Sequence, residues 1–187
     1  AVDQVILGGL SMGGQIVFEF YRQFPSRVRA LILADTQPQA ETEQGRIGRY
    51  EMAQRVVDKG MENLANEILP KLVAARTFDE RPDVVEKVRQ MILGTNPEGA
   101  AAALRGRAER RDYIPLMREI NVPTLVVVGS EDAYTPVSDA HLMHQGIAGS
   151  QLVVFEGIGH MPNMERPGEF NAALMPFVRS VIASWRM

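Results

Sequence analysis

The chain has 187 residues, of which 45% are hydrophobic and 23% charged, a balance typical of one globular domain and not of a disordered or fibrous protein. Twenty Lys and Arg residues against 23 Asp and Glu residues give a net charge of −3, which argues against nucleic-acid binding. The absence of cysteine excludes disulfides, thiolate metal sites and a cysteine nucleophile. No apolar run approaches the roughly 18 residues of a membrane span, so we expect no membrane partner. A cytoplasmic location is a separate expectation, which the membrane pattern does not establish.

The first predicted elements form a strand–helix–strand unit. An apolar run over residues 2–7 indicates a buried strand, and the Gly-rich residues 8–14 indicate a tight turn. Apolar residues then recur at helical spacing up to Pro25, and residues 28–34 form a second apolar run that ends at Asp35. Two strands around a helix in so short a span favour a parallel sheet covered by helices on both faces. The predicted fold class is therefore α/β.

The stretch from residue 37 to residue 111 has a different pattern. It contains no strand-like run, and glycine and proline divide it into segments with helical periodicity. A connection of this length is far longer than an ordinary loop in a compact α/β domain. We therefore predict a core formed by residues 1–36 and 112–187, with residues 37–111 inserted as a helical cap. The predicted cap helices cover residues 42–58, 61–69, 82–93 and 98–110.

The alternation of strands and helices resumes after this insertion. Residues 124–128 and 151–155 are apolar and predict the third and fourth strands, with a predicted helix over residues 136–147 between them. An amphipathic helix over residues 167–185 closes the chain, and Pro176 inside it is expected to kink or split it. The core should therefore hold about four parallel strands.

A G-x-S-x-G motif lies at the turn between the first strand and the first helix, with Ser11 at its centre. A strand that turns sharply into a helix exposes the corner residue in a strained backbone conformation. The flanking positions must be small to avoid collision, and here they are Gly9 and Gly13. The serine hydroxyl then lies at a helix N-terminus, where the Met12 N–H is placed to bind an oxyanion. Ser11 is thus a candidate nucleophile, while a nucleotide loop is disfavoured because its glycine and lysine signatures are absent.

A serine nucleophile needs a base, and the base needs an acid that orients it. In this kind of strand–helix arrangement the acid and the histidine follow the serine, each at the carboxyl end of a later strand. His160 is the one histidine of three that follows a predicted strand in this way, and Asp132 follows the strand before it. Asp35, also at the end of a strand, is the alternative acid. The sequence therefore predicts a triad of Ser11, His160 and Asp132.

With these features the sequence resembles the α/β-hydrolase superfamily. The matching segments are GLSMGG around Ser11, VPTLVVVGSEDAYTP around Asp132 and GIGHMPNMERPGEF around His160, and the helical insertion lies where that family carries its cap. Within the family the chain is most similar to small cap-bearing esterases and lactonases, including 3-oxoadipate enol-lactonases. The resemblance implies hydrolysis of a small carboxylic ester or lactone through an acyl-enzyme, with no metal and no organic cofactor.

The family pattern also has three or four strands before the strand that leads to the nucleophile, and this sequence begins at that strand. The preceding segment normally carries the second N–H of the oxyanion hole. We therefore interpret the sequence as a fragment, a processed chain or one half of an assembly. An apolar strand over residues 2–7 without its neighbour would recruit another strand. This predicts a homo-oligomer or a complex with a missing N-terminal segment.

Other functions are compatible with the same residues. The triad also supports cofactor-free perhydrolase or haloperoxidase chemistry and the hydrolysis of carbon–carbon bonds. A chain that holds only half of an oxyanion hole is also compatible with a non-catalytic interaction module of hydrolase fold. Ester turnover by the chain would exclude the non-catalytic alternative.

Two further groups of residues have alternative interpretations. His141 and His144 have the spacing of metal ligands on one helix face but lack a third ligand, so a solvated face is favoured. A basic cluster is assigned to a solvated cap face, with contact to a substrate carboxylate as the alternative. Its members are Arg105, Arg107, Arg110 and Arg111.

Overall fold

The computed structural model describes residues 2–185, and its centre is one parallel sheet with the strand order β1-β2-β3-β4. Apolar and β-branched residues form these strands because such side chains pack well on a pleated, buried surface. The strands are β1 (Val5–Leu10), β2 (Val28–Ala34), β3 (Thr124–Gly129) and β4 (Gln151–Phe155). The predicted α/β class and the four-stranded parallel sheet are confirmed.

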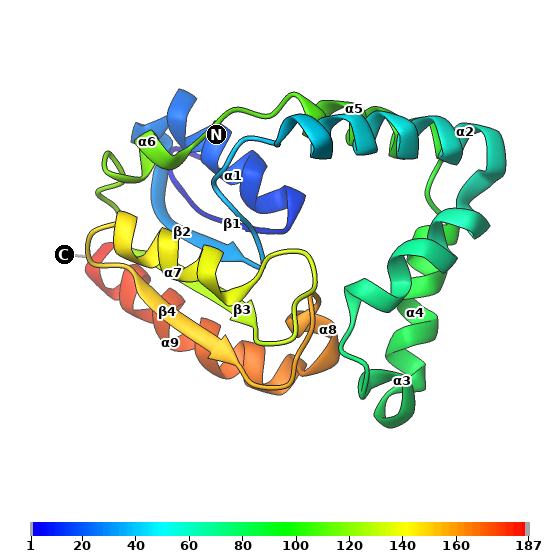
Figure 1. The fold of residues 1–187 in the computed structure, drawn as a ribbon. Coiled ribbons are helices and arrows are strands. Elements are labelled where there is room, and N and C mark those ends of the chain that lie inside the picture. Colours follow the sequence, from blue (N-terminus) through cyan, green and yellow to red (C-terminus); the bar gives the residue numbers. More distant parts are fainter. Residues whose placement is uncertain (1, 186–187) are drawn as a thin grey trace.

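Helices cover both faces of this sheet (Figure 1). On β2, Leu31 and Leu33 face a core shared with three helices. Ala30 and Ala34, at the alternate positions, face a second core shared with the C-terminal helix, as the period of two along a strand requires. The first three helices are α1 (Met12–Gln23), α6 (Ile114–Met117) and α7 (Val137–Gly146), and the C-terminal helix is α9 (Pro167–Trp185).

The strand bounds agree with the prediction except at the first strand. β2 and β4 have the predicted bounds, and β3 is one residue longer. β1 begins at Val5 and ends at Leu10, so the prediction of a strand over residues 2–7 is wrong at both ends. Gly8 and Gly9 do not begin the turn but continue the pairing with β2. The ladder uses backbone groups, so residues without side chains can extend it where the neighbouring strand is close.

The segment of residues 37–111 contains four helices and no strand, and we call these four the cap helices. They are α2 (Glu43–Leu72), α3 (Thr77–Glu80), α4 (Pro82–Leu93) and α5 (Pro97–Ala108). α2 consists of two helical segments that meet at a kink at Gly60, where φ is 77°, so the predicted break between two helices at this glycine is confirmed. The cap helices share an apolar core of their own. They form a layer beyond the carboxyl ends of β2, β3 and β4 (Figure 1).

Short helices and one proline depart from the prediction. Three four-residue helices, α3, α6 and α8 (Pro162–Glu165), have no predicted counterpart because one helical turn is too short for an apolar repeat. α9 continues through Pro176 as one helix, so of the two predicted outcomes the split is wrong, while the kink stays a prediction. The proline removes one hydrogen bond from a 19-residue helix that is anchored by its packing on the sheet. No helix within residues 2–185 is long and apolar enough to cross a membrane.

Candidate active site

Ser11 is the one-residue corner between β1 and α1. Its backbone angles, φ 55° and ψ −118°, lie in the strained region of positive φ that the motif predicts. The Ser11 N–H donates a hydrogen bond to the Ala34 carbonyl at 2.9 Å, and the Thr36 hydroxyl donates to the Ser11 carbonyl at 2.7 Å. The end of β2 therefore fixes this corner. The Met12 N–H that follows is one of the helix N-terminal amides without an intrahelical acceptor.

The small residues around this corner are needed for different reasons. A Cβ on Gly9 would overlap the carbonyl carbon of Gly13. A Cβ on Gly13 would meet nothing within 4 Å, so the expectation that both flanking positions are crowded is wrong for Gly13. The crowding comes from the backbone of Gly13, while its Cβ direction is open. The second crowded position is Gly14, where a Cβ would overlap the Thr36 side chain.

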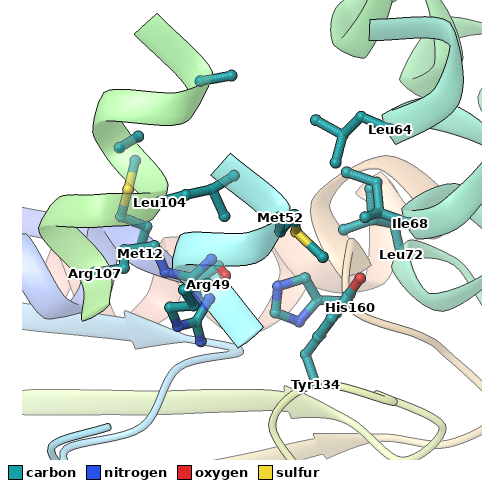
Figure 2. Close-up of a pocket in the computed structure, with 13 residues that line it drawn as sticks. Met12, Arg49, Met52, Leu64, Ile68, Leu72, Leu104, Arg107, Tyr134 and His160 are labelled. Atoms are coloured by element: carbon teal, nitrogen blue, oxygen red, sulfur yellow. The ribbon is translucent and has the colours of Figure 1, made fainter. Parts of the chain in front are cut away.

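Ser11 and His160 line one cavity of about 270 Å³ between the carboxyl edge of the sheet and the cap helices (Figure 2). This volume lies just below the range typical of sites for drug-sized ligands, so the cavity suits a small molecule. Arg49, Arg107 and Tyr134 supply its other polar groups. The remaining wall is apolar and consists of Met12, Met52, Leu64, Ile68, Leu72, Ala100, Ala103 and Leu104.

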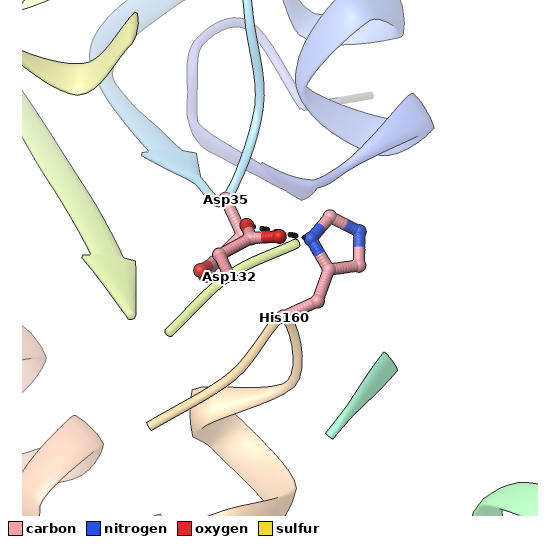
Figure 3. Close-up of side chains that lie close together, drawn as sticks. All are labelled: Asp35, Asp132 and His160. Carbon is pink, nitrogen blue, oxygen red and sulfur yellow. Dashed lines mark hydrogen bonds and ion pairs between the residues drawn. The ribbon is translucent and has the colours of Figure 1, made fainter. Parts of the chain in front are cut away.

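Asp132 and His160 form a buried pair beyond the carboxyl ends of β3 and β4 (Figure 3). His160 Nδ1 lies 2.7 Å from Asp132 Oδ2. Asp132 also accepts hydrogen bonds from the N–H groups of Tyr134 and Thr135, at 2.7 and 3.1 Å, and from the Thr135 hydroxyl. Burial acts to raise the pKa of Asp132, but the hydrogen bonds outweigh it and hold the pKa below its usual value. Asp132 is therefore ionised, and Nε2 is the histidine nitrogen that remains available to accept a proton.

Asp35, the alternative acid, lies beside this pair and has a different environment (Figure 3). Its side chain is fully buried, its Oδ1 accepts a hydrogen bond from the Gly129 N–H at 2.9 Å, and its Oδ2 has no donor. Burial, together with the nearby Asp132 charge, raises the pKa of Asp35 to about 9, despite the hydrogen bond from Gly129. Asp35 is therefore a neutral acid at pH 7. The carboxylate that contacts the His160 ring is therefore that of Asp132 and not that of Asp35.

Glu165 connects the histidine loop to the cap, although no sequence pattern marks it. Its buried carboxylate accepts hydrogen bonds from the N–H groups of Gly159 and Met161, on either side of the histidine, at 3.0 and 3.3 Å. It also accepts from the Ala74 N–H at 2.8 Å and from the Thr77 hydroxyl at 2.6 Å, both in the cap segment. One carboxylate thus positions the histidine backbone and the cap together.

A metal is not the best explanation for the carboxylates near the histidine. Asp35, Asp132 and His160 form the one group of three potential ligands found in residues 2–185, with the ligand atoms within 4.8 Å of one another. The four lone pairs of the Asp132 carboxylate already accept hydrogen bonds, and Asp35 is neutral. The histidine pair on α7 belongs to no such group, and His144 Nδ1 lies 2.9 Å from the Ser150 hydroxyl.

The basic cluster predicted for a solvated cap face divides between two environments. Arg105 and Arg111 are exposed, as expected. Arg107 instead lines the cavity, and Arg110 is almost fully buried, with its Nη1 2.9 Å from Glu41. The prediction is wrong for Arg107 because it lies two residues from Arg105 on α5, and residues two apart on a helix project to nearly opposite sides. It is wrong for Arg110 because this residue follows α5 and its guanidinium donates to Glu41 and to the Gln39 carbonyl. Arg49, Tyr134 and Glu165 also have no signal in the sequence, because their roles depend on contacts between distant segments.

A family model described as alpha/beta hydrolase fold matches residues 2–167. The chain therefore belongs to the α/β-hydrolase fold family, as the three motifs indicate.

Relatives of the chain include lactonases and esterases. It is 30% identical to 3-oxoadipate enol-lactonase 2 of Acinetobacter baylyi over 173 aligned residues, and this aligned region covers 92% of this chain and 63% of that protein. A thermophilic esterase from Thermogutta terrifontis, solved with malate bound, is 41% identical with a TM-score of 0.93, covering 96% of this chain and 66% of that one. The enol-lactonase from Burkholderia xenovorans LB400 is 25% identical with a TM-score of 0.86, covering 95% and 66%. The chain thus spans about two thirds or less of the length of these relatives.

Proposed function

We propose that this chain carries the catalytic residues of a serine hydrolase that acts on small carboxylic esters or lactones. The observation that carries the proposal is the buried Asp132–His160 pair, at 2.7 Å, in one cavity with a serine at a strained strand–helix corner. An imidazole oriented by a carboxylate is the usual activator of a serine hydroxyl. Ser11, His160 and Asp132 are the proposed nucleophile, base and orienting acid.

The proposed mechanism proceeds through an acyl-enzyme. Ser11 Oγ attacks the acyl carbon while His160 Nε2 takes its proton, and the Asp132 carboxylate stabilises the imidazolium that forms. The Met12 N–H donates a hydrogen bond to the oxyanion of the tetrahedral intermediate. The intermediate collapses as His160 returns the proton to the leaving alkoxide. Water, deprotonated by His160, then attacks the acyl-enzyme. The second tetrahedral intermediate collapses as His160 returns the proton to Ser11 Oγ, which releases the acid and restores the serine. Each step uses side chains, one backbone N–H and water.

The substrate class is supported by the cavity and by the relatives. A cavity of about 270 Å³ with a mainly apolar wall suits a short acyl chain or a small ring. The relatives are named as enol-lactonases and an esterase, whose reactions open a carboxylic ester bond. Both observations favour a small carboxylic ester or lactone as the substrate of this chain.

The test measures the turnover of short methyl esters and of a small lactone, monitored by the release of acid. Two matched serine variants are compared with the parent chain. Ser11→Ala should abolish turnover, whereas Ser138→Ala, on the exposed face of α7, should leave it unchanged. Turnover that survives Ser11→Ala would contradict the proposal. If the folded chain is inactive on all esters but forms peracids or cleaves carbon–carbon bonds, the ester hydrolase proposal is wrong and the corresponding alternative activity is favoured. A folded chain inactive in every assay would favour the non-catalytic alternative.

We also propose that β1 pairs with a further strand. Within residues 2–185, β1 forms a ladder with β2 and with no other strand. A strand with one free edge presents unpaired backbone groups that recruit another strand. The partner would be a second copy of the chain or a segment that precedes it in a longer protein. Light scattering at high concentration should show a mass above that of one chain, and a stable monomer would contradict self-association.

A further inference from the structure

Arg107, on α5, has no partner although part of its guanidinium is buried. Its Nε is inaccessible to solvent and has no acceptor, and the side chain forms no hydrogen bond or ion pair within residues 2–185. In the part of the chain that the structure describes, two other buried side-chain atoms lack partners, Asp35 Oδ2 and Gln39 Oε1, and neither residue lines the cavity. A cation that is partly buried and has no acceptor for an inaccessible N–H is costly, so its presence at a cavity needs an explanation.

The charges around Arg107 increase this imbalance. Arg49, Arg107 and Arg110 lie near a single carboxylate, Glu41. Glu41 accepts hydrogen bonds from Arg49 Nε and from Arg110 Nη1, the latter at 2.9 Å, so it already serves the other two arginines. Burial, followed by the positive charges of Arg49 and Arg110, lowers the pKa of Arg107 to about 10, with Glu41 opposing the shift. Arg107 is therefore charged at neutral pH, and this region lacks negative charge.

The unpartnered arginine lines the cavity that Ser11 and His160 share. Arg49 and Arg107 lie on one side of His160, and the apolar side chains of Leu64 and Ile68 lie on the other side (Figure 2). Met12 and Leu104 lie on the arginine side as well, so that side combines cationic and apolar groups, whereas the labelled residues on the far side are apolar (Figure 2). Both guanidinium groups that line the cavity therefore lie toward one end of it, where they can bind an anionic group of a ligand whose reacting carbonyl lies at the serine.

We propose that Arg107, assisted by Arg49, forms a subsite for a free carboxylate, so that the substrate is a small ester or lactone that carries a carboxylate group. This inference rests on the proposed function and specifies its substrate class. Guanidinium groups bind carboxylates through parallel N–H···O hydrogen bonds, which match the planar geometry of the carboxylate. The carboxylate remains unchanged in the reaction, because the bond broken is that of the ester at Ser11.

The subsite should act on binding more than on chemistry. Its contacts are with a part of the substrate that does not change charge, so they stabilise the ground state and the transition state equally. Removing Arg107 should therefore raise KM for an anionic ester by about 10- to 100-fold, the range expected for hydrogen bonds to a charged group, with little change in kcat. The KM for a neutral ester of the same shape should not rise.

The deciding experiment measures binding in a variant that cannot turn over. In the Ser11→Ala protein, calorimetry compares monomethyl succinate with methyl 4-methylpentanoate, in which an isopropyl group replaces the carboxylate. Monomethyl succinate should bind at least about 10-fold more tightly, and the preference should disappear when Arg107→Met is added. Arg105→Met is the matched control, because it removes the same charge from the exposed side of α5 and should keep the preference. Arg107→Lys should retain part of it, because the charge remains while the planar fork is lost.

Three results would overturn the proposal. The first is equal binding of the two esters, which includes the case in which neither binds, and the second is a preference that survives Arg107→Met. The third is inorganic phosphate that binds as tightly as monomethyl succinate and displaces it, which would show a general anion site. Arg107→Met removes an unpaired charge and should fold normally, with a melting temperature equal to or above that of its parent. Failure of the proposed function appears separately, as turnover that does not depend on Ser11, because this calorimetry requires no turnover.

Discussion

The two walls of the cavity differ in how their polar groups are partnered. At the edge of the sheet, Asp132 accepts hydrogen bonds at all four of its lone-pair positions, one of them from His160. At the cap wall, Arg107 has no partner among residues 2–185, and Arg49 has one through its Nε. A fully bonded acid–base pair is preorganised, because it needs no rearrangement when charge develops in the reaction. An unpartnered cation is completed only by a ligand. We infer that the sheet edge provides the chemistry and the cap wall selects the substrate.

The largest expected effect separates the two acids at the sheet edge. Asp132→Asn should lower kcat by about 10⁴-fold, because an amide facing Nδ1 favours the wrong histidine tautomer and cannot stabilise the imidazolium. Asp35→Asn should lower it by less than about 10-fold, because Asp35 is already neutral and an amide preserves the acceptor for Gly129. Ester turnover at pH 8 measures both variants. The opposite order would assign the orienting role to Asp35.

The next effect tests whether the two walls depend on each other. Glu165→Ala removes a buried carboxylate that four donors share, so it should lower the free energy of unfolding by about 3–5 kcal/mol. Glu169→Ala, an exposed position at the start of α9, should change it by less than about 0.5 kcal/mol. Urea unfolding measures both. Equal losses would show that Glu165 does not join the cap to the histidine loop.

A smaller effect should appear in the pH dependence of stability. The pKa of Asp35 is about 9 in the folded protein and about 4 in an unfolded chain, so the folded state keeps a proton that the unfolded state loses. The stability of the parent, compared with that of Asp35→Asn, should fall by up to about 1.4 kcal/mol per pH unit as pH rises from 5 to 8. Below pH 4 the two should be parallel. Unfolding curves that stay parallel from pH 5 to 8 would contradict a neutral Asp35.

The smallest effect concerns the bend in the cap. Gly60 has φ 77° and ψ −179°, a combination that only glycine adopts readily, so Gly60→Ala should destabilise the chain by about 1–3 kcal/mol. Gly48 lies in the regular part of the same helix, and Gly48→Ala should stabilise it by about 0.5–1 kcal/mol. An added Cβ meets no atom within 4 Å at either position, so backbone conformation alone sets the difference. Thermal unfolding with effects of the same sign would contradict the bent helix.

The two walls also differ in how far the sequence predicts them. The sheet edge is predictable because strands have a short period, and because the serine motif, Asp132 and His160 each follow a strand closely. The departures there are local: glycines prolong β1 as far as Leu10, and Gly13 is less crowded than expected. The helices of the cap are predictable from the sequence, but which of their side chains line the cavity is not. Arg107 and Arg105 look alike in a basic cluster, and only the packing of α5 on α2, which places Arg107 at the cavity and Arg105 in solvent, distinguishes them.

The central claim is that Ser11 is a nucleophile activated by the His160–Asp132 pair. The most direct measurement is the intact mass of the folded chain after reaction with a fluorophosphonate, which attaches to activated serines. We expect one adduct on the parent chain, none on Ser11→Ala, and one on Ser138→Ala. No adduct on a chain that circular dichroism shows to be folded, or an adduct that persists in Ser11→Ala, would contradict it.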